Sequence, residues 1–239
     1  MEILYIAALT VLAAGVGTLT GFGTSTIMVP VLLIWLPLPQ TLLLVGVIHW
    51  FGNVWKMSMF RQGLNWRLIL LFGVPGVVLT FIGARLVFSV PEELLSRILG
   101  AFLIGYVVFL LIKPRFKLSQ RNTTAVVGGG LSGFLAGIFG VGGAVRGAFL
   151  SMFDLKKSVY IATAGAIGLA VDSVRLSTYY SQGTRLEPDL LLGLLAFIPA
   201  SLLGAWLAKS VVTRIPQTSF RMVIAAFLLI AGLKLLVFP

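Results

Sequence analysis

Three polar residues lie at helical spacing within an apolar segment, residues 41–60. His49, Asn53 and Lys56 stand at i, i+4 and i+7, so a helix carries them as one stripe on one face. A charge at the centre of a membrane helix costs about 2.5–3.5 kcal/mol, so such residues usually face a cavity or a partner. The stripe is therefore a candidate interior binding site. Lys56 is also close enough to Arg61 to extend to the membrane interface instead.

A second stripe, in residues 159–180, contains Asp172 and Arg175. These two residues are about one helical turn apart, so a structural ion pair is one interpretation of them. Arg146 lies in another apolar segment, and together with Lys56 and Arg175 it makes three interior cations against one acid, Asp172. One acid cannot neutralise three cations. The residues therefore favour the binding of an anion, which would supply the missing negative charge.

His49 is the only histidine of the chain, and it has two interpretations. A single histidine among apolar residues is often a packing residue with a hydrogen-bond partner. The alternative is proton coupling, for which His49 and Asp172 are the candidates because both titrate within reach of physiological pH when perturbed. The chain has no cysteine and no acid near His49 in the sequence, so we expect no metal site and no other cofactor.

Two glycine-rich breaks interrupt long apolar runs, at residues 21–26 and 140–146. Glycine adopts a positive φ without strain, and a helix that restarts after a break exposes free N–H groups and the positive end of its dipole. The Ser and Thr residues of the first break suit this position because their oxygens can cap such N–H groups. We interpret both breaks as the tips of re-entrant hairpins that meet and hold an anion.

The predicted substrate-binding residues come from the two stripes and the two breaks. They are Gly21, Gly23, Thr24, Ser25, Thr26, His49, Asn53, Lys56, Gly140, Gly142, Gly143, Arg146, Asp172 and Arg175. Other glycines, such as Gly129, Gly133 and Gly137, are spaced by four, a pattern typical of closely packed membrane helices.

The composition is that of a membrane protein. The 239 residues are 59% hydrophobic and only 10% charged, which is more apolar surface than a soluble domain of this size can bury. The net charge of +11 is scattered over short loops between apolar runs, as membrane orientation requires, so nucleic acid is not an expected partner. We therefore expect an all-α polytopic membrane protein.

The layout is duplicated, with Asn53 aligning on Asp172 and Lys56 on Arg175 at an offset of 119. Each repeat is predicted to contain one re-entrant hairpin and three transmembrane helices. The first repeat is residues 1–112, with a hairpin at 3–36 and spans at 41–60, 68–88 and 94–112; a basic cytoplasmic linker is 113–122; the second repeat is 123–239, with a hairpin at 123–153 and spans at 159–180, 190–208 and 220–238.

The loop charges predict the orientation. The basic linker should be cytoplasmic, and hairpins that enter and return on one side keep the other basic loops there as well. Each repeat then crosses the membrane an odd number of times, so the two repeats are inverted, which is a common plan in transporters. We expect a multi-pass protein of the cytoplasmic (inner) membrane with both termini extracytoplasmic.

The run from Gly15 through Gly23 to Val29-Pro30-Val31, repeated loosely in residues 133–143, resembles the TauE/SafE sulfite and organosulfonate exporter family. The resemblance covers the whole chain through its length and duplicated layout. The sequence departs from the family pattern at Thr24-Ser25, where more glycine is usual, and at Phe149, where the second proline would sit. The resemblance implies export of small sulfur oxyanions or sulfonates.

The resulting prediction is a secondary transporter, not an enzyme, that exports sulfite or an organosulfonate by alternating access, with one half moving against the other. The breaks lack the GK[ST] ending of a phosphate loop, so a nucleotide-driven pump is not expected. A passive anion channel and a non-transporting membrane scaffold or receptor remain alternatives. The expected partners are the small anion, the lipid bilayer and, as an open alternative, a second copy in a homodimer.

Overall fold

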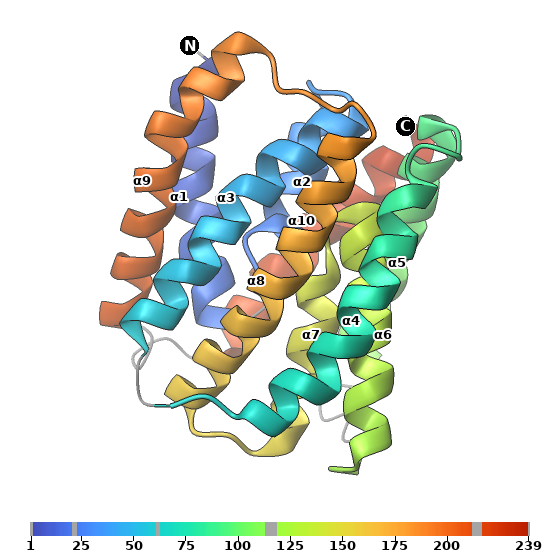
Figure 1. The fold of residues 1–239 in the computed structure, drawn as a ribbon. Coiled ribbons are helices and arrows are strands. Elements are labelled where there is room, and N and C mark those ends of the chain that lie inside the picture. The colour runs from blue at the N-terminus through green and yellow to red at the C-terminus, as the bar shows by residue number, and fades with distance from the viewer. Residues whose placement is uncertain (1, 21–22, 61–62, 113–118, 212–216, 239) are drawn as a thin grey trace.

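The protein, seen here as a computed structural model, is built from helices joined by short connections (Figure 1). The structure describes residues 2–20, 23–60, 63–112, 119–211 and 217–238, and these contain no β-strand. The predicted all-α class is therefore confirmed for the described residues. Within these residues, five helices are long and apolar enough to cross a membrane, namely α1 (Glu2–Thr20), α4 (Trp66–Leu86), α6 (Asn122–Phe139), α8 (Lys157–Ser181) and α9 (Pro188–Val211).

The remaining helices are α3, α5, α10 and two short ones. Their bounds are α2 (Ser25–Leu32), α3 (Leu38–Met59), α5 (Glu92–Ile112), α7 (Gly142–Leu150) and α10 (Gln217–Val237), and a 3-10 turn, Ser151–Phe153, follows α7. The two short helices, α2 and α7, are the segments that restart after the glycine-rich breaks.

The first break folds α2 back onto α1. Gly23 has a φ of +83°, a conformation that favours glycine. A Cβ atom at Gly17 on α1 would lie 2.6 Å from the backbone of Gly23 and Thr24, so only glycine permits this close approach. Thr24 is the N-cap of α2, but its side chain makes no capping hydrogen bond, so the predicted capping by this hydroxyl is wrong.

The second break has the same form. Gly140 ends α6 with a φ of +70°, and its N–H donates to the Ala136 carbonyl at 3.0 Å. A Cβ atom at Gly142 would lie 1.9 Å from the Ser132 carbonyl oxygen, so the first residue of α7 packs directly on the backbone of α6. Because Gly23 and Gly140 hold equivalent positions, the local offset between the breaks is 140 − 23 = 117, whereas the sequence alignment used 119.

Helices from the two halves of the sequence pack against each other. α4 packs on α6, α1 on α9, α3 on α8 and α5 on α10. In Figure 1, α3 runs downward and α8 runs upward beside it, so the pair is antiparallel. The α4–α6 contact depends on glycine, since a Cβ atom at Gly133 would lie 2.1 Å from the Gly76 carbonyl oxygen. The α1–α9 contact is similar, with Gly204 against Val11.

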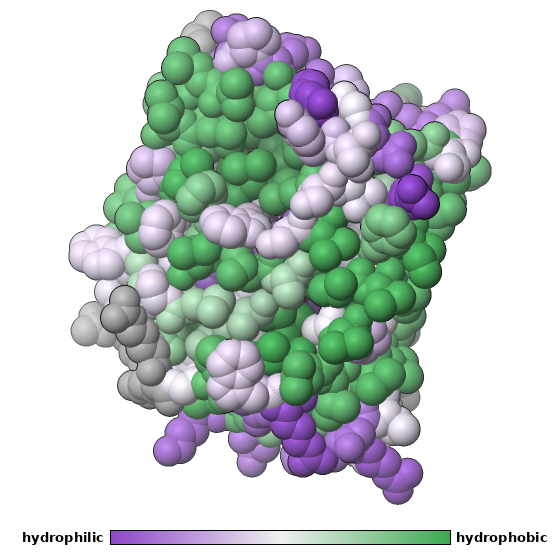
Figure 2. All heavy atoms as spheres, in the orientation of Figure 1, coloured by the Kyte–Doolittle hydropathy of each residue, from purple (hydrophilic) through white to green (hydrophobic). Residues whose placement is uncertain are grey.

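The outer surface carries a broad apolar band. Figure 2 shows hydrophobic residues over the middle of the molecule and hydrophilic residues gathered at its two ends. Large apolar side chains such as Leu195, Trp206 and Leu70 are 75%, 58% and 61% exposed. Exposure of this extent is expected where lipid covers the surface. The labels for the N- and C-termini lie toward the same end in Figure 1.

Candidate functional site

The polar stripes of α3 and α8 meet where these helices cross, around the carboxylate of Asp172. His49 Nδ1 lies 2.7 Å from Asp172 Oδ2, and Asn53 Nδ2 donates to the same oxygen at 2.9 Å. Arg175 Nε donates to Asp172 Oδ1 at 2.8 Å. None of these four side chains is more than 3% exposed. The ion pair considered for Asp172 and Arg175 is present, and the carboxylate has three donors among the described residues.

His49 has no acid near it in the sequence, but the structure places one beside it. Asp172 lies 123 positions away in the sequence and reaches His49 only because α3 and α8 cross. A carboxylate accepts hydrogen bonds and does not donate them, so Nδ1 of His49 carries the hydrogen between them. Among the described residues there is still no group of three or more side chains that could hold a metal ion.

The other ring nitrogen of His49 faces the tip of the first hairpin. Nε2 lies 2.8 Å from the position that a Cβ atom would take at Gly23, and it has no hydrogen-bond partner among the described residues. The same Cβ position at Gly23 is 3.7 Å from the Cα atom of Gly143. The tips of the two hairpins therefore lie next to each other, with the His49 ring beside them.

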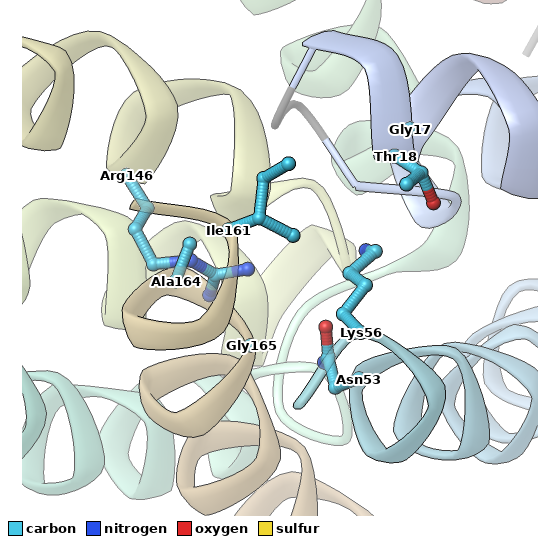
Figure 3. A pocket seen from close by; sticks show the side chains of 8 residues that line it. All are labelled: Gly17, Thr18, Asn53, Lys56, Arg146, Ile161, Ala164 and Gly165. Carbon is cyan, nitrogen blue, oxygen red and sulfur yellow. The ribbon is translucent and has the colours of Figure 1, made fainter. Parts of the chain in front are cut away.

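A narrow pocket lies beside this crossing, with a cavity volume of about 10 Å³, close to the size of one water molecule (Figure 3). Lys56 reaches it from α3 and Arg146 from α7, and Figure 3 shows them on opposite sides. Lys56 is 6% exposed and Arg146 is 3% exposed. The full lining is Gly17, Thr18, Asn53, Lys56, Arg146, Ile161, Ala164 and Gly165.

Neither cation of the pocket has an acidic partner within the described part of the chain. The ion pairs found there join His49 and Arg175 to Asp172 and Arg97 to Glu93, and Lys56 and Arg146 take part in none of them. Arg146 Nε is buried without a hydrogen-bond partner in the same residues. The alternative interpretation of Lys56, extension to the membrane interface, is not what the structure shows, because its side chain turns inward to the pocket.

Unused hydroxyl groups lie on the pocket wall and at the start of α2. The hydroxyl oxygens of Thr18, Thr24 and Ser25 are buried and lack a hydrogen-bond partner in the described residues. Buried polar groups without partners are rare in proteins, and each unsatisfied one costs about 1–3 kcal/mol. Hydroxyl and guanidinium donors left unused in one region are suited to an anion, which accepts from all of them.

The predicted site residues divide into three groups. Asn53, Lys56 and Arg146 line the pocket, and His49, Asp172 and Arg175 form the hydrogen-bonded cluster at the crossing. The others lie at the hairpin tips, where Arg175 Nη1 is 2.9 Å from the Cβ position of Gly140. Gly21 lies outside the described residues; the remaining tip residues are Gly23, Thr24, Ser25, Thr26, Gly140, Gly142 and Gly143.

Sequence reasoning missed several residues of the pocket wall. Thr18 and Gly17 come from the end of α1, and Ile161, Ala164 and Gly165 from the first turns of α8. Thr18 could have been predicted from the sequence, because it is a hydroxyl residue just before the first break. The apolar wall could not, since Ile161 and Ala164 look like ordinary membrane-helix residues.

The family model of the sulfite exporter TauE/SafE matches residues 6–235, nearly the whole chain. No curated protein matches the chain.

Proposed function

This chain belongs to the sulfite exporter TauE/SafE family of membrane transporters, and we propose that it binds its anion in the pocket between Lys56 and Arg146. It is an integral membrane protein, and its family implies a small anionic substrate. The proposed activity is export of sulfite or an organosulfonate by alternating access. One observation carries this proposal: two buried cations face one pocket and neither has an acidic partner among the described residues.

The charge balance supports an anion of one or two negative charges. Asp172 is already engaged by His49, Asn53 and Arg175, so it is not free to neutralise the pocket. Three cations, Lys56, Arg146 and Arg175, against one carboxylate leave a surplus of two positive charges. A buried charge without a partner is strongly unfavourable. An anion that enters the pocket therefore removes much of the unfavourable free energy of the two cations.

The position of the pocket favours access from the end that carries the basic residues. Its lining comes from the last turns of α3 and the first turns of α8, which lie toward the same end of the molecule (Figure 1). Arg67, Arg121 and Lys156 flank helices at that end, which is cytoplasmic by the positive-inside rule. The opposite half of α3 is sealed by fully buried apolar residues such as Leu42, Leu44, Val45 and Ile48.

An inverted repeat, with halves 1–112 and 123–239 joined by a basic cytoplasmic linker, is part of the proposal. It is supported by the antiparallel course of α3 and α8 and by matched packing, α4 on α6 and α9 on α1. The direct hydrogen bond between Asn53 and Asp172 also supports it, because residues that correspond in the two repeats touch near a two-fold axis. Both termini would then lie on the extracytoplasmic side of the inner membrane.

The packing argues against movement of one sequence half against the other. α4 belongs to the first half but is locked to α6 through backbone contact at Gly133, and α9 is locked to α1 at Gly204. We therefore propose two moving bodies that differ from the sequence halves in one helix each, because α9 moves with the first half and α4 with the second. The α9 body is α1, α2, α3 and α9, and the α4 body is α4, α6, α7 and α8.

The pocket lies between these two bodies. Lys56 and Thr18 belong to the α9 body, whereas Arg146 and Gly165 belong to the α4 body. An anion held by both cations draws the two bodies together, and an empty pocket leaves two like charges facing each other. Substrate-dependent closure of this kind is the differential contact that alternating access requires.

Sulfite flux in proteoliposomes tests the proposal. We expect saturable sulfite efflux from vesicles that contain the wild-type protein, and loss of that efflux in Lys56→Gln. Flux that does not saturate and far exceeds carrier rates would favour the passive channel instead. Absence of both flux and anion binding would favour the scaffold or receptor.

A further inference from the structure

We propose that His49 takes up a proton when the anion binds, so that proton and anion binding are linked in this transporter. The inference rests on the proposed function, because it needs an anion in the pocket between Lys56 and Arg146. It adds a coupling group that is not itself part of the pocket lining.

The geometry leaves one position on His49 for the proton. Nδ1 already carries a hydrogen, because its partner at 2.7 Å is the carboxylate of Asp172. Nε2 is buried and has no hydrogen-bond partner among the described residues, so its lone pair is unused in the neutral ring. The incoming proton comes from water, bonds to this lone pair and returns to water when the anion leaves.

Asp172 is the less suitable proton carrier. Its carboxylate accepts from His49, Asn53 and Arg175 at distances of 2.7–2.9 Å. Protonation would remove acceptor capacity and leave the Arg175 guanidinium, which is fully buried, without a counter-charge. Protonation of His49 breaks none of these contacts, and it converts the contact with Asp172 into an ion pair.

The groups that face His49 explain why the two binding events are linked. From α8 come Asp172 and Arg175, and from α3 come Asn53 and Lys56. Arg146 of α7 lies farther along, beside Asn53 at Gly168. The net charge of these groups is already positive, so an imidazolium in the empty site adds a further positive charge to the surplus. A bound anion removes that penalty.

Asn53 connects the histidine to the pocket. It lines the pocket, donates to Asp172 and has its Nδ2 atom 3.4 Å from His49 Nδ1. The anion is therefore one residue away from the titrating ring, within the range where charges in a poorly solvated interior interact strongly. Linkage is reciprocal, so protonation of His49 must strengthen anion binding by the same factor that the anion strengthens protonation.

The test is anion binding as a function of pH, measured by calorimetry on the purified protein. Methanesulfonate is the suitable probe because, unlike sulfite, it keeps a single charge over the range of histidine titration. For the wild type we expect the affinity to rise as the pH falls, by at most about tenfold per pH unit for one linked proton. We also expect proton uptake on binding, seen as a binding enthalpy that changes with the ionisation enthalpy of the buffer.

The variant His49→Gln should show a flat pH profile and no proton uptake, at whatever affinity it retains. A wild-type profile that is already flat, with a binding enthalpy independent of the buffer, would overturn the inference without needing any variant. An unchanged pH dependence in His49→Gln would overturn it as well. Failure of the wild type to bind methanesulfonate or sulfite at any pH would instead contradict the proposed function, so the two failures are distinguishable.

Discussion

At the scale of single residues, Lys56 is expected to destabilise the empty protein and to stabilise the occupied one. The residue is 6% exposed, and its charge has no acidic partner among the described residues. We predict that Lys56→Gln raises the free energy of unfolding without anion, by roughly 2–3 kcal/mol. The same variant should lose the stabilisation by sulfite, which for the wild type is about 2.7 kcal/mol at a concentration of 100 times Kd.

Thermal unfolding in detergent, with and without sulfite, measures both effects. Lys156→Gln is the matched control, because Lys156 is exposed in the connection before α8 and should change neither quantity. If Lys56→Gln were less stable than the wild type and still stabilised by sulfite, Lys56 would have a structural role only.

Asp172 has the opposite energetic role, because three donors depend on it. We predict that Asp172→Asn lowers the free energy of unfolding by about 3–5 kcal/mol, since the Arg175 charge then stays buried without its partner. Chemical denaturation followed by intrinsic fluorescence measures the loss. Asp189→Asn, at an exposed position in the first turn of α9, is the control and should be neutral. A neutral Asp172→Asn would mean that the carboxylate does not hold the crossing together.

The sequence predicted the members of this cluster but not their contacts. Helical spacing was enough to place His49, Asn53 and Lys56 on one face and to pair Asp172 with Arg175. The contact of His49 with Asp172 depends on how α3 crosses α8, which no local pattern encodes. Thr18 was missed although its hydroxyl lies just before the first break, whereas the apolar residues of the opposite wall, such as Ile161, look like ordinary membrane-helix residues.

At the scale of helices, close packing of α4 on α6 depends on glycine. A Cβ atom at Gly133 would lie 2.1 Å from the backbone oxygen of Gly76, and backbone cannot move aside cheaply. We predict that Gly133→Ala destabilises the protein by about 1–3 kcal/mol or more. Gly73→Ala on α4 is the matched control, because its Cβ would meet nothing within 4 Å, and a gain of about 0.5–1 kcal/mol is expected there.

Retention of the fold and of thermal stability can be read from helical circular dichroism on heating. Equal stability of Gly133→Ala and Gly73→Ala would contradict the tight α4–α6 contact. It would also remove the main argument that α4 moves with the second hairpin.

The helix breaks were predictable, but their local details were not. Glycine at Gly23 and Gly140 signalled a chain reversal, and both residues have the positive φ that this requires. The sequence alignment placed Gly23 on Gly142, two residues too far along the chain. Gly142 is already the first residue of α7, and the residue with the positive φ that corresponds to Gly23 is Gly140. Hydroxyl capping was also misjudged, since the Thr24 side chain is left free of any capping bond.

At the scale of the whole molecule, the orientation in the membrane is directly measurable. The chain contains no cysteine, so a single introduced cysteine reports its own side without background. We predict that Ser89→Cys and Gln182→Cys react with a membrane-impermeant thiol reagent in intact cells, because both lie in connections at the end opposite the basic linker. Ser119→Cys, within that linker, should react only after the membrane is permeabilised. The reverse pattern would contradict the proposed orientation.

The proposed moving bodies predict which cross-links stop transport. Trp50 on α3 contacts Ser173 on α8 across the two bodies, whereas Trp55 on α3 contacts Ser201 on α9 within the α9 body. With cysteine pairs at these positions and a short bifunctional reagent, we expect the 50–173 link to block sulfite flux and the 55–201 link to leave it intact. Flux blocked only by the 55–201 link would show that α9 does not move with α3.

The central claim is that one small anion binds between Lys56 and Arg146, and it is tested most directly by locating that anion. Selenite is a close analogue of sulfite, and its selenium atom can be found by anomalous scattering from crystals of the protein. The account predicts a single strong peak between Lys56 Nζ and the Arg146 guanidinium, near Thr18, and its loss in Lys56→Gln. A saturated crystal with no peak in this pocket, or with the peak at another place in the protein, would contradict it.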